Sequence, residues 1–138
     1  YCSDDAFFSI EEINVGIVAD LGTLQRLPKL IGEGIVRELA YTGRRMLAEE
    51  ALRRQFVNEI FADREALMDG VFSLARIIAS RAPLAVRGTK HILNFSRDRS
   101  VEDGLAYVAT WNAATILSND VAEAIGAKLA GGDPQFED

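Results

Sequence analysis

The stretch from Glu12 to Pro28 reads EINVGIVADLGTLQRLP. It is mostly apolar and interrupted by glycine, yet it carries two carboxylates, Glu12 and Asp20, eight positions apart. In a helix, eight residues separate two side chains by about 12 Å along the axis, and in a strand by about 26 Å. Neither regular structure brings the carboxylates together, whereas the glycines at positions 16 and 22 permit the chain to fold back between them.

Apolar neighbours on both sides would desolvate the two carboxylates. Desolvation raises the pKa of a carboxyl group, which suits proton transfer near neutral pH. The alternative is that Glu12 is a solvated residue beside Glu11 and that Asp20 caps a helix, because charged side chains are mostly exposed. The spacing alone leaves both interpretations open. The neighbours in question are Ile13, Val15, Ile17, Val18 and Leu21.

The composition narrows the class of protein. The 138 residues fit one domain or a piece of a larger one, with 49% hydrophobic and 26% charged residues. A net charge of -6 makes nucleic acid and anionic membranes poor partners. The single cysteine, Cys2, permits no internal disulfide, and together with the single histidine, His91, it cannot form a protein-only zinc site. We therefore expect no metal, and no apolar run reaches the roughly 18 residues of a membrane helix.

Local patterns predict a mixed first part and a helical remainder. Two short strands cannot form an independently stable sheet, so the first part is expected to complete a sheet whose other strands lie elsewhere. The expected elements of the first part are short strand or irregular structure over 5–18, a helix with Thr23 as its N-cap and Pro28 inside it, helices over 33–42 and 48–54, and a strand over 56–61. The later helices are expected over 64–80, over 83–95, after a capping box of Ser100 and Asp103, and over 121–130 with Asn119 as its cap.

Several motifs, in their order and spacing, resemble the enoyl-CoA hydratase/isomerase, or crotonase, superfamily. They are FSIEEINVGI (8–17), GTLQRLP (22–28), LAYTGRR (39–45), AEEAL (48–52) and VN (57–58). The resemblance covers essentially the whole chain as the C-terminal half of that fold. It implies an α/β, crotonase-like (ClpP/crotonase) fold: residues 1–62 form the C-terminal part of the core, at the end of the β-spiral, and 63–138 form a helical oligomerisation region.

A narrower similarity rests on Ala19-Asp20, where many crotonases have Pro-Gly. With GTLQRLP (22–28), SRDRSV (96–101) and YVATWN (107–112), this pair resembles the Δ3,5-Δ2,4-dienoyl-CoA isomerase family. The resemblance implies isomerisation of 3,5-dienoyl-CoA to 2,4-dienoyl-CoA in fatty-acid beta-oxidation. Glu12, which matches the catalytic glutamate shared with hydratases, would be the base near C2, and Asp20 the acid near C6. It also implies an acyl-CoA substrate, no cofactor, and a homotrimer or a dimer of trimers.

The chain also departs from the family pattern. The third acidic residue and the oxyanion-hole segments of the family would precede Tyr1, so we expect an upstream part. Gln55 stands where many relatives have glycine, and Asn14 replaces an acid of close relatives; both look peripheral. Two rivals stay open: another crotonase activity, such as enoyl-CoA hydratase or Δ3-Δ2-enoyl-CoA isomerase, or a non-catalytic assembly subunit. The expected location is mitochondrial or peroxisomal in a eukaryote and otherwise cytoplasmic.

For the other candidate residues, a structural role is favoured over a functional one. Arg44-Arg45 could contact a CoA phosphate, but an exposed pair at a helix end is favoured. Tyr107 and Trp111, four residues apart, are expected to pack on one face, and Lys90-His91 to be a surface pair. Cys2 is expected to be an inert buried thiol.

Overall fold

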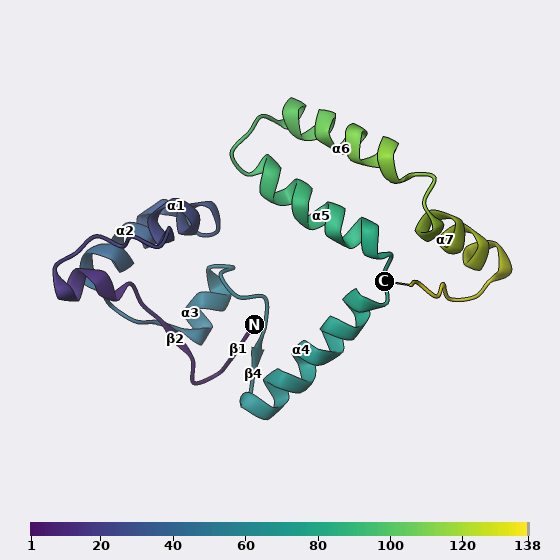
Figure 1. Cartoon of the computed structure of the whole chain (residues 1–138). Helices are drawn as coiled ribbons and strands as arrows, with labels where there is room; N and C mark the ends of the chain where they lie inside the picture. The colour runs from purple at the N-terminus through teal and green to yellow at the C-terminus, as the bar shows by residue number, and fades with distance from the viewer. Residues whose placement is uncertain (138) are drawn as a thin grey trace. The chain divides into compact units, whose positions relative to one another are not determined.

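The computed structural model describes residues 1–137. The chain divides into two compact units, Tyr1–Phe72 and Ser73–Asp138, and helix α4 (Arg64–Ala79) runs from one into the other (Figure 1). The predicted division between a crotonase core and a helical region at residues 62 and 63 stays a prediction.

The strands of the first unit are only two residues long. β1 (Cys2–Ser3) pairs in parallel with β4 (Ile60–Phe61), and β2 (Phe7–Phe8) pairs antiparallel with β3 (Met46–Leu47). The predicted strand over 56–61 is wrong in its first four residues, and β3 was not predicted. Two separate two-residue pairs agree with the expectation that no self-sufficient sheet lies in this part of the chain.

The end of helix α3 (Ala48–Arg53) explains why Phe56 and Val57 are not in a strand. The N–H of Phe56 donates to the carbonyl of Ala51 over 2.9 Å, and the N–H of Gln55 to that of Leu52 over 2.9 Å. These two bonds form a Schellman motif, which needs a left-handed residue after the helix. Gln55 has that conformation, with φ of 60°, as the only non-glycine residue with positive φ among the described residues.

Replacing Gln55 with glycine is expected to stabilise the protein. A left-handed L-residue costs about 1–2 kcal/mol, while glycine costs about 0.5–1 kcal/mol in unfolded-state entropy. The net gain in free energy of unfolding of the full-length protein should be about 0.5–1 kcal/mol, measured by urea denaturation. The matched control is Gln25→Gly inside helix α1 (Thr23–Arg26), where the same change should destabilise the protein. If both variants change the free energy of unfolding in the same direction, the interpretation is wrong.

The remaining helices of the first unit agree with the sequence pattern except at α1. Its N-cap is Gly22, with φ of 89° and no side-chain cap, so the prediction of Thr23 as N-cap is wrong. A 3-10 turn, η2 (Leu27–Lys29), follows α1, because Pro28 cannot continue a regular helix. Helix α2 (Glu33–Thr42) ends at Gly43, whose φ of 62° confirms the predicted helix stop.

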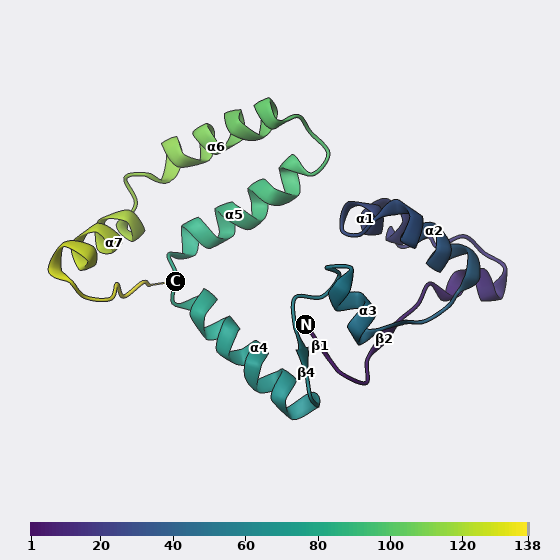
Figure 2. The ribbon, with the colours of Figure 1, turned by 180° about the vertical axis from the view of Figure 1, so that it is seen from behind.

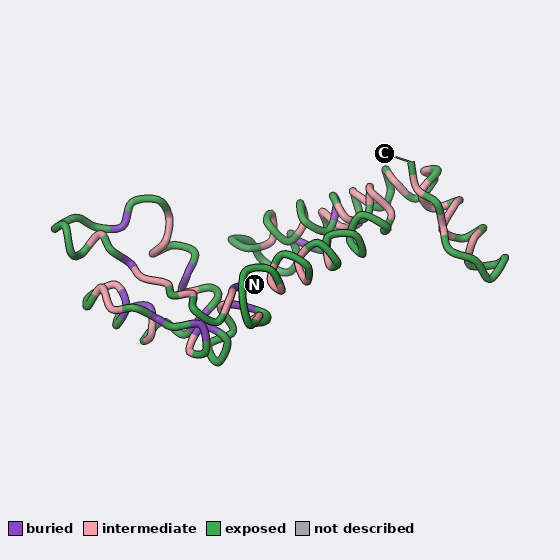
Figure 3. Tube along the Cα trace, turned by 90° about the horizontal axis from the view of Figure 1, so that it is seen from below, coloured by how far each residue is buried: buried purple, intermediate pink, exposed green. Residues whose placement is uncertain are grey.

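The buried apolar side chains gather in the first unit, whereas the buried residues that the structure describes in the second unit are two glycines, Gly88 and Gly104. Figure 3 shows them along the tube as short purple segments between exposed green ones. Phe8 and Phe56 pack on this core edge to face, with ring centroids 4.9 Å apart. The free thiol of Cys2 is buried, as predicted. The core consists of Cys2, Ile10, Ala19, Leu27, Ile31, Val36, Leu39, Met46, Ala48, Ala51 and Val57.

The second unit contains α5 (Pro83–Ser96), α6 (Val101–Thr115) and α7 (Asn119–Ala130) after the end of α4. Helices α5 and α6 lie side by side in both ribbon views (Figures 1 and 2). The predicted capping box of Ser100 and Asp103 is confirmed. Asn119 as a cap is wrong, because Ser118 holds the N-cap position and Asn119 begins the helix.

An aromatic cluster joins α5 to α6. The ring of Trp111 lies directly against Gly88, and Nε2 of His91 lies 2.7 Å from the hydroxyl of Tyr107. The ring of Phe95 packs against that of Tyr107 at a tilt of 39°, with centroids 4.4 Å apart. The predicted packing face of Tyr107 and Trp111 is thus confirmed, and His91 belongs to it.

Many large apolar side chains of the second unit are exposed. Leu117 and Leu129 are 96% and 84% exposed, and Leu105 and Leu93 show about two thirds of their surface. Within residues 1–137, no helix is long and apolar enough to cross a membrane. In the same residues, no group of three or more His, Cys, Asp or Glu side chains could hold a metal ion.

Candidate active site

Glu12 lies in a 3-10 turn, η1 (Glu11–Val15), which ends in a left-handed glycine. Gly16 has φ of 77°; its N–H donates to the carbonyl of Ile13 over 3.3 Å, and that of Ile17 donates to the carbonyl of Glu12 over 3.1 Å. This is again a Schellman pair, and it reverses the chain directly after Glu12. Gly16 and Gly22, the two glycines that the sequence singled out for a reversal of the chain, both have positive φ.

The side chain of Glu12 is half-buried and lines a cavity of about 310 Å³. A carboxylate set among apolar side chains is suited to accept a proton from a carbon acid. The apolar lining consists of Ile10, Ile13, Ile17, Val18, Ala19, Leu24, Pro28, Val36 and Ala40.

A polar row on α2 completes this cavity. Nη2 of Arg37 lies 2.5 Å from Oε1 of Glu33, and Nη1 donates to the hydroxyl of Tyr41 over 2.9 Å. These bonds raise the pKa of Arg37, with Glu33 as the larger cause. This row was not predicted from the sequence, although the spacing of four residues places all three side chains on one face of a helix.

Asp20 occupies a different environment from Glu12. Its side chain is exposed, as are those of Val18 (73%) and Leu21 (83%). The expectation that apolar neighbours desolvate Asp20 is thus wrong for this chain, because those neighbours are themselves largely exposed. The structure places Glu12 on the 310 Å³ cavity but brings Asp20 into no cavity together with it among the described residues.

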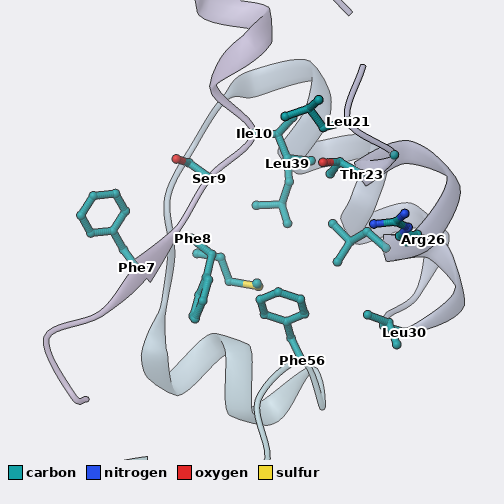
Figure 4. Close-up of a pocket in the computed structure, with 13 residues that line it drawn as sticks. Phe7, Phe8, Ser9, Ile10, Leu21, Thr23, Arg26, Leu30, Leu39 and Phe56 are labelled. Atoms are coloured by element: carbon teal, nitrogen blue, oxygen red, sulfur yellow. The ribbon is translucent and has the colours of Figure 1, made fainter. Parts of the chain in front are cut away.

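A second cavity, of about 510 Å³, lies next along the chain. Its lining includes Leu21 and Thr23, which follow Asp20, whereas Val18 and Ala19, which precede Asp20, line the cavity of Glu12. Figure 4 shows the rings of Phe8 and Phe56 on one side of this second cavity and Arg26 and Leu30 on the other. Asp20 therefore stands in the segment that separates two apolar hollows.

Polar contacts hold the turn of Glu12 to its surroundings. Nδ2 of Asn14 donates to Oε2 of Glu11 over 2.7 Å. Hydrogen bonds from Ser9 and then Asn14 lower the pKa of the Glu11 carboxyl, with a smaller effect of the Arg45 charge. The guanidinium of Arg45 stacks 3.9 Å above the ring of Phe7, which fixes strand β2 just before the turn.

Arg44 is not the exposed helix-end residue that the sequence suggested. Its guanidinium is half-buried and makes a two-pronged bond to Glu50, at 2.8 and 2.9 Å, while Nε lies 2.6 Å from Glu38. Arg44 lowers the pKa of Glu50 through these bonds. Because carboxylates of α2 and α3 both bind its guanidinium, Arg44 fixes the segment between these two helices.

The whole chain belongs to the enoyl-CoA hydratase/isomerase family, whose model matches residues 1–138. The crotonase-like fold that the motifs implied is confirmed by this match and by solved structures. One is an enoyl-CoA hydratase from Mycobacterium tuberculosis H37Rv, at 35% identity and a TM-score of 0.91, covering 98% of this chain and 53% of the other. Another is an enoyl-CoA hydratase from Bacillus anthracis, at 30% identity and a TM-score of 0.91, covering 97% and 52%.

Curated relatives agree with the narrower resemblance. The peroxisomal Δ(3,5)-Δ(2,4)-dienoyl-CoA isomerase of Arabidopsis thaliana is 49% identical over 136 residues, which are 99% of this chain and 49% of the relative. The mitochondrial isomerase of Homo sapiens is 47% identical over 128 residues, or 92% and 39%. A carnitinyl-CoA dehydratase of Salmonella arizonae is 40% identical over 140 residues, or 99% and 53%. The chain spans about half the length of these relatives, or less.

Proposed function

We propose that the protein to which this chain belongs isomerises 3,5-dienoyl-CoA to 2,4-dienoyl-CoA in fatty-acid beta-oxidation. The observation that supports this proposal most is the carboxylate pair Glu12 and Asp20 in a chain 49% identical to a named dienoyl-CoA isomerase. No cofactor is needed, because the thioester carbonyl of the substrate itself acidifies the protons at C2.

The reaction moves one proton from C2 to C6. Glu12 takes the C2 proton, the electron pair delocalises from C2 through the diene, and Asp20 delivers a proton at C6. The double bonds at C3 and C5 become double bonds at C2 and C4, and the two carboxyl groups return to their starting states by proton exchange. Because C2 and C6 lie at opposite ends of the diene, two groups in two environments serve better than one.

The positions of the two acids support this division of roles. Glu12 lines an apolar cavity, and Asp20 lies in the segment between that cavity and its neighbour. A diene that lies along this segment would present one end to each carboxyl group. The exposed apolar side chains around Asp20 then serve as contacts for the acyl chain or for other parts of the protein.

Assembly and location complete the proposal. Exposed leucines on α6 and α7 suit contacts between subunits, which favours a homotrimer or a dimer of trimers. The named relatives are peroxisomal in Arabidopsis thaliana and mitochondrial in Homo sapiens, so we propose one of these compartments for a eukaryotic source.

A second candidate is hydration or dehydration of a CoA ester. It is favoured by the carnitinyl-CoA dehydratase, which is 40% identical to this chain, and by the solved enoyl-CoA hydratases described above, which are up to 35% identical. These relatives share the fold, so the fold alone does not separate the two functions.

Turnover of two substrates by the full-length protein tests the choice. We expect 3,5-dienoyl-CoA to be isomerised with a kcat/KM at least about tenfold above that for hydration of 2-enoyl-CoA, a difference of about 1.4 kcal/mol in transition-state binding. Formation of the conjugated 2,4-diene is followed by ultraviolet absorbance. Faster turnover of the simple enoyl substrate would reject the isomerase in favour of the hydratase.

A further inference from the structure

The side chain of Asn14 joins the turn of Glu12 to the end of helix α2. Its Nδ2 donates to the carboxylate of Glu11, the residue directly before Glu12, over 2.7 Å. On its other side the amide lies against Gly43. A Cβ placed on Gly43 would stand only 2.7 Å from Nδ2 and 2.8 Å from Oδ1 of Asn14. Real Cβ atoms do not approach so closely, so a side chain at position 43 would displace the amide of Asn14.

Gly43 provides a fixed point for this contact. Its N–H donates to the carbonyl of Leu39 over 2.9 Å, and its left-handed backbone ends α2. The next residue, Arg44, is held by Glu38 from α2 and by Glu50 from α3. The amide of Asn14 therefore rests on a part of the backbone that several bonds immobilise.

The two segments that Asn14 connects form opposite parts of one lining. Glu12 and Ile13 of the turn line the 310 Å³ cavity, and so do Arg37 and Tyr41 of α2. A shift of the turn relative to α2 would change both the shape of the cavity and the direction of the Glu12 carboxylate. Asn14 is not among the residues that line the cavity, so it acts from behind the turn.

We propose that Asn14, held between Glu11 and Gly43, is a positioning residue that sets the direction of the Glu12 carboxylate in its cavity. It touches no reacting atom and acts through the backbone of η1. This inference rests on the proposed function, because the direction of Glu12 matters to turnover only if Glu12 is the base. A misplacement of about 1 Å in such a group can cost on the order of a hundredfold in rate.

Asn14→Ala in the full-length protein removes both contacts of the amide. We expect kcat to fall about ten- to a hundredfold while KM changes less than about twofold. Exchange of the C2 proton with solvent should fall together with kcat. The isotope effect on a substrate deuterated at C2 should grow, because proton abstraction becomes slower than the other steps. A merely structural role would lower the melting temperature and leave the isotope effect unchanged.

Gly43→Ala tests the same contact from the other side, with Gly131→Ala as its matched control. Both glycines end a helix with a left-handed backbone, at φ of 62° and 70°, so both alanines carry similar backbone strain. Only at Gly43 would the new Cβ displace Asn14, since nothing lies within 4 Å of a Cβ at Gly131. We expect Gly43→Ala to lose kcat like Asn14→Ala, and Gly131→Ala to keep the wild-type kcat.

The double variant Asn14→Ala/Gly43→Ala should lose no more activity than the worse single variant, because both changes break one contact. Wild-type kcat in Asn14→Ala, or equal losses in Gly43→Ala and Gly131→Ala, would overturn the positioning role. Each variant is assayed on 3,5-dienoyl-CoA and on 2-enoyl-CoA. If the wild type turns over only 2-enoyl-CoA, the isomerase proposal fails, and the kcat values on that substrate decide the role of Asn14. A wild type inactive on both overturns both proposals.

Discussion

Glu12→Gln should reduce turnover of 3,5-dienoyl-CoA by the full-length protein by about 10²–10⁴-fold. Glutamine keeps the shape and the hydrogen-bonding capacity of Glu12 but cannot take up a proton. Glu12 lies among apolar side chains of its cavity, and the carboxylate of Glu33, which lines the same cavity, is paired with Arg37 and does not offer a free base in its place. Exchange of the C2 proton with deuterated water, followed by mass spectrometry, should stop together with product formation.

Folding and binding should survive this change. Glu12 is half-exposed, and its turn is closed by backbone bonds that glutamine leaves in place, so the melting temperature and the affinity for a CoA ester should stay close to wild type. Glu59→Gln is the matched control, because Glu59 is an exposed glutamate of the same unit that lines neither cavity. A variant that retains C2 exchange at the wild-type rate would show that another group is the base.

Helices and family membership could be predicted from the sequence because their signals are local. Ser100 and Asp103 form their capping box within four residues, and Gly43 and Gly16 have the left-handed backbone that glycine makes inexpensive. Pro28 breaks its helix for an equally local reason, since it has no N–H to donate. The motifs that identify the family are likewise contiguous runs.

Features that depend on distant partners could not be predicted in the same way. Residues 56–61 alternate like a strand, but only Ile60 and Phe61 find a partner, in β1, while Phe56 completes the end of α3. Gln55 adopts a left-handed conformation, which is usual for glycine and uncommon for other residues. The turn at Gln55 was therefore not predicted from the sequence. The two-residue strand β3 has no periodicity to detect.

The same distinction between local and distant signals applies to the candidate site. Glu12 and Asp20 were selected by motif, and their roles stay a prediction. The spacing of Glu33, Arg37 and Tyr41 could be recognised in the sequence, but only the structure shows that these three residues line the cavity. Asn14 looked peripheral in the sequence because its partner Gly43 is 29 positions away, and only the fold brings the two together.

Asp20→Asn should separate the two halves of the reaction. Product formation should fall by about 10²–10⁴-fold, because asparagine cannot deliver the proton at C6. Exchange at C2 should stay partly active, since abstraction of that proton belongs to Glu12. The measurement compares the rate of C2 exchange with the rate of diene formation on the same sample, and the ratio should rise strongly over that of the wild type.

The exposure of Asp20 makes this ratio the decisive quantity. Asp20 is exposed and does not cap α1, whose N-cap is Gly22, so without a catalytic role its conversion to asparagine would cost only a surface charge. A structural role therefore predicts wild-type product formation and an unchanged ratio. Asp4→Asn, at an exposed aspartate of the same unit outside both cavities, shows how little loss of a surface charge costs. Product at the wild-type rate in Asp20→Asn would remove Asp20 from the mechanism, and the proposal of a dienoyl-CoA isomerase would lose its main chemical support.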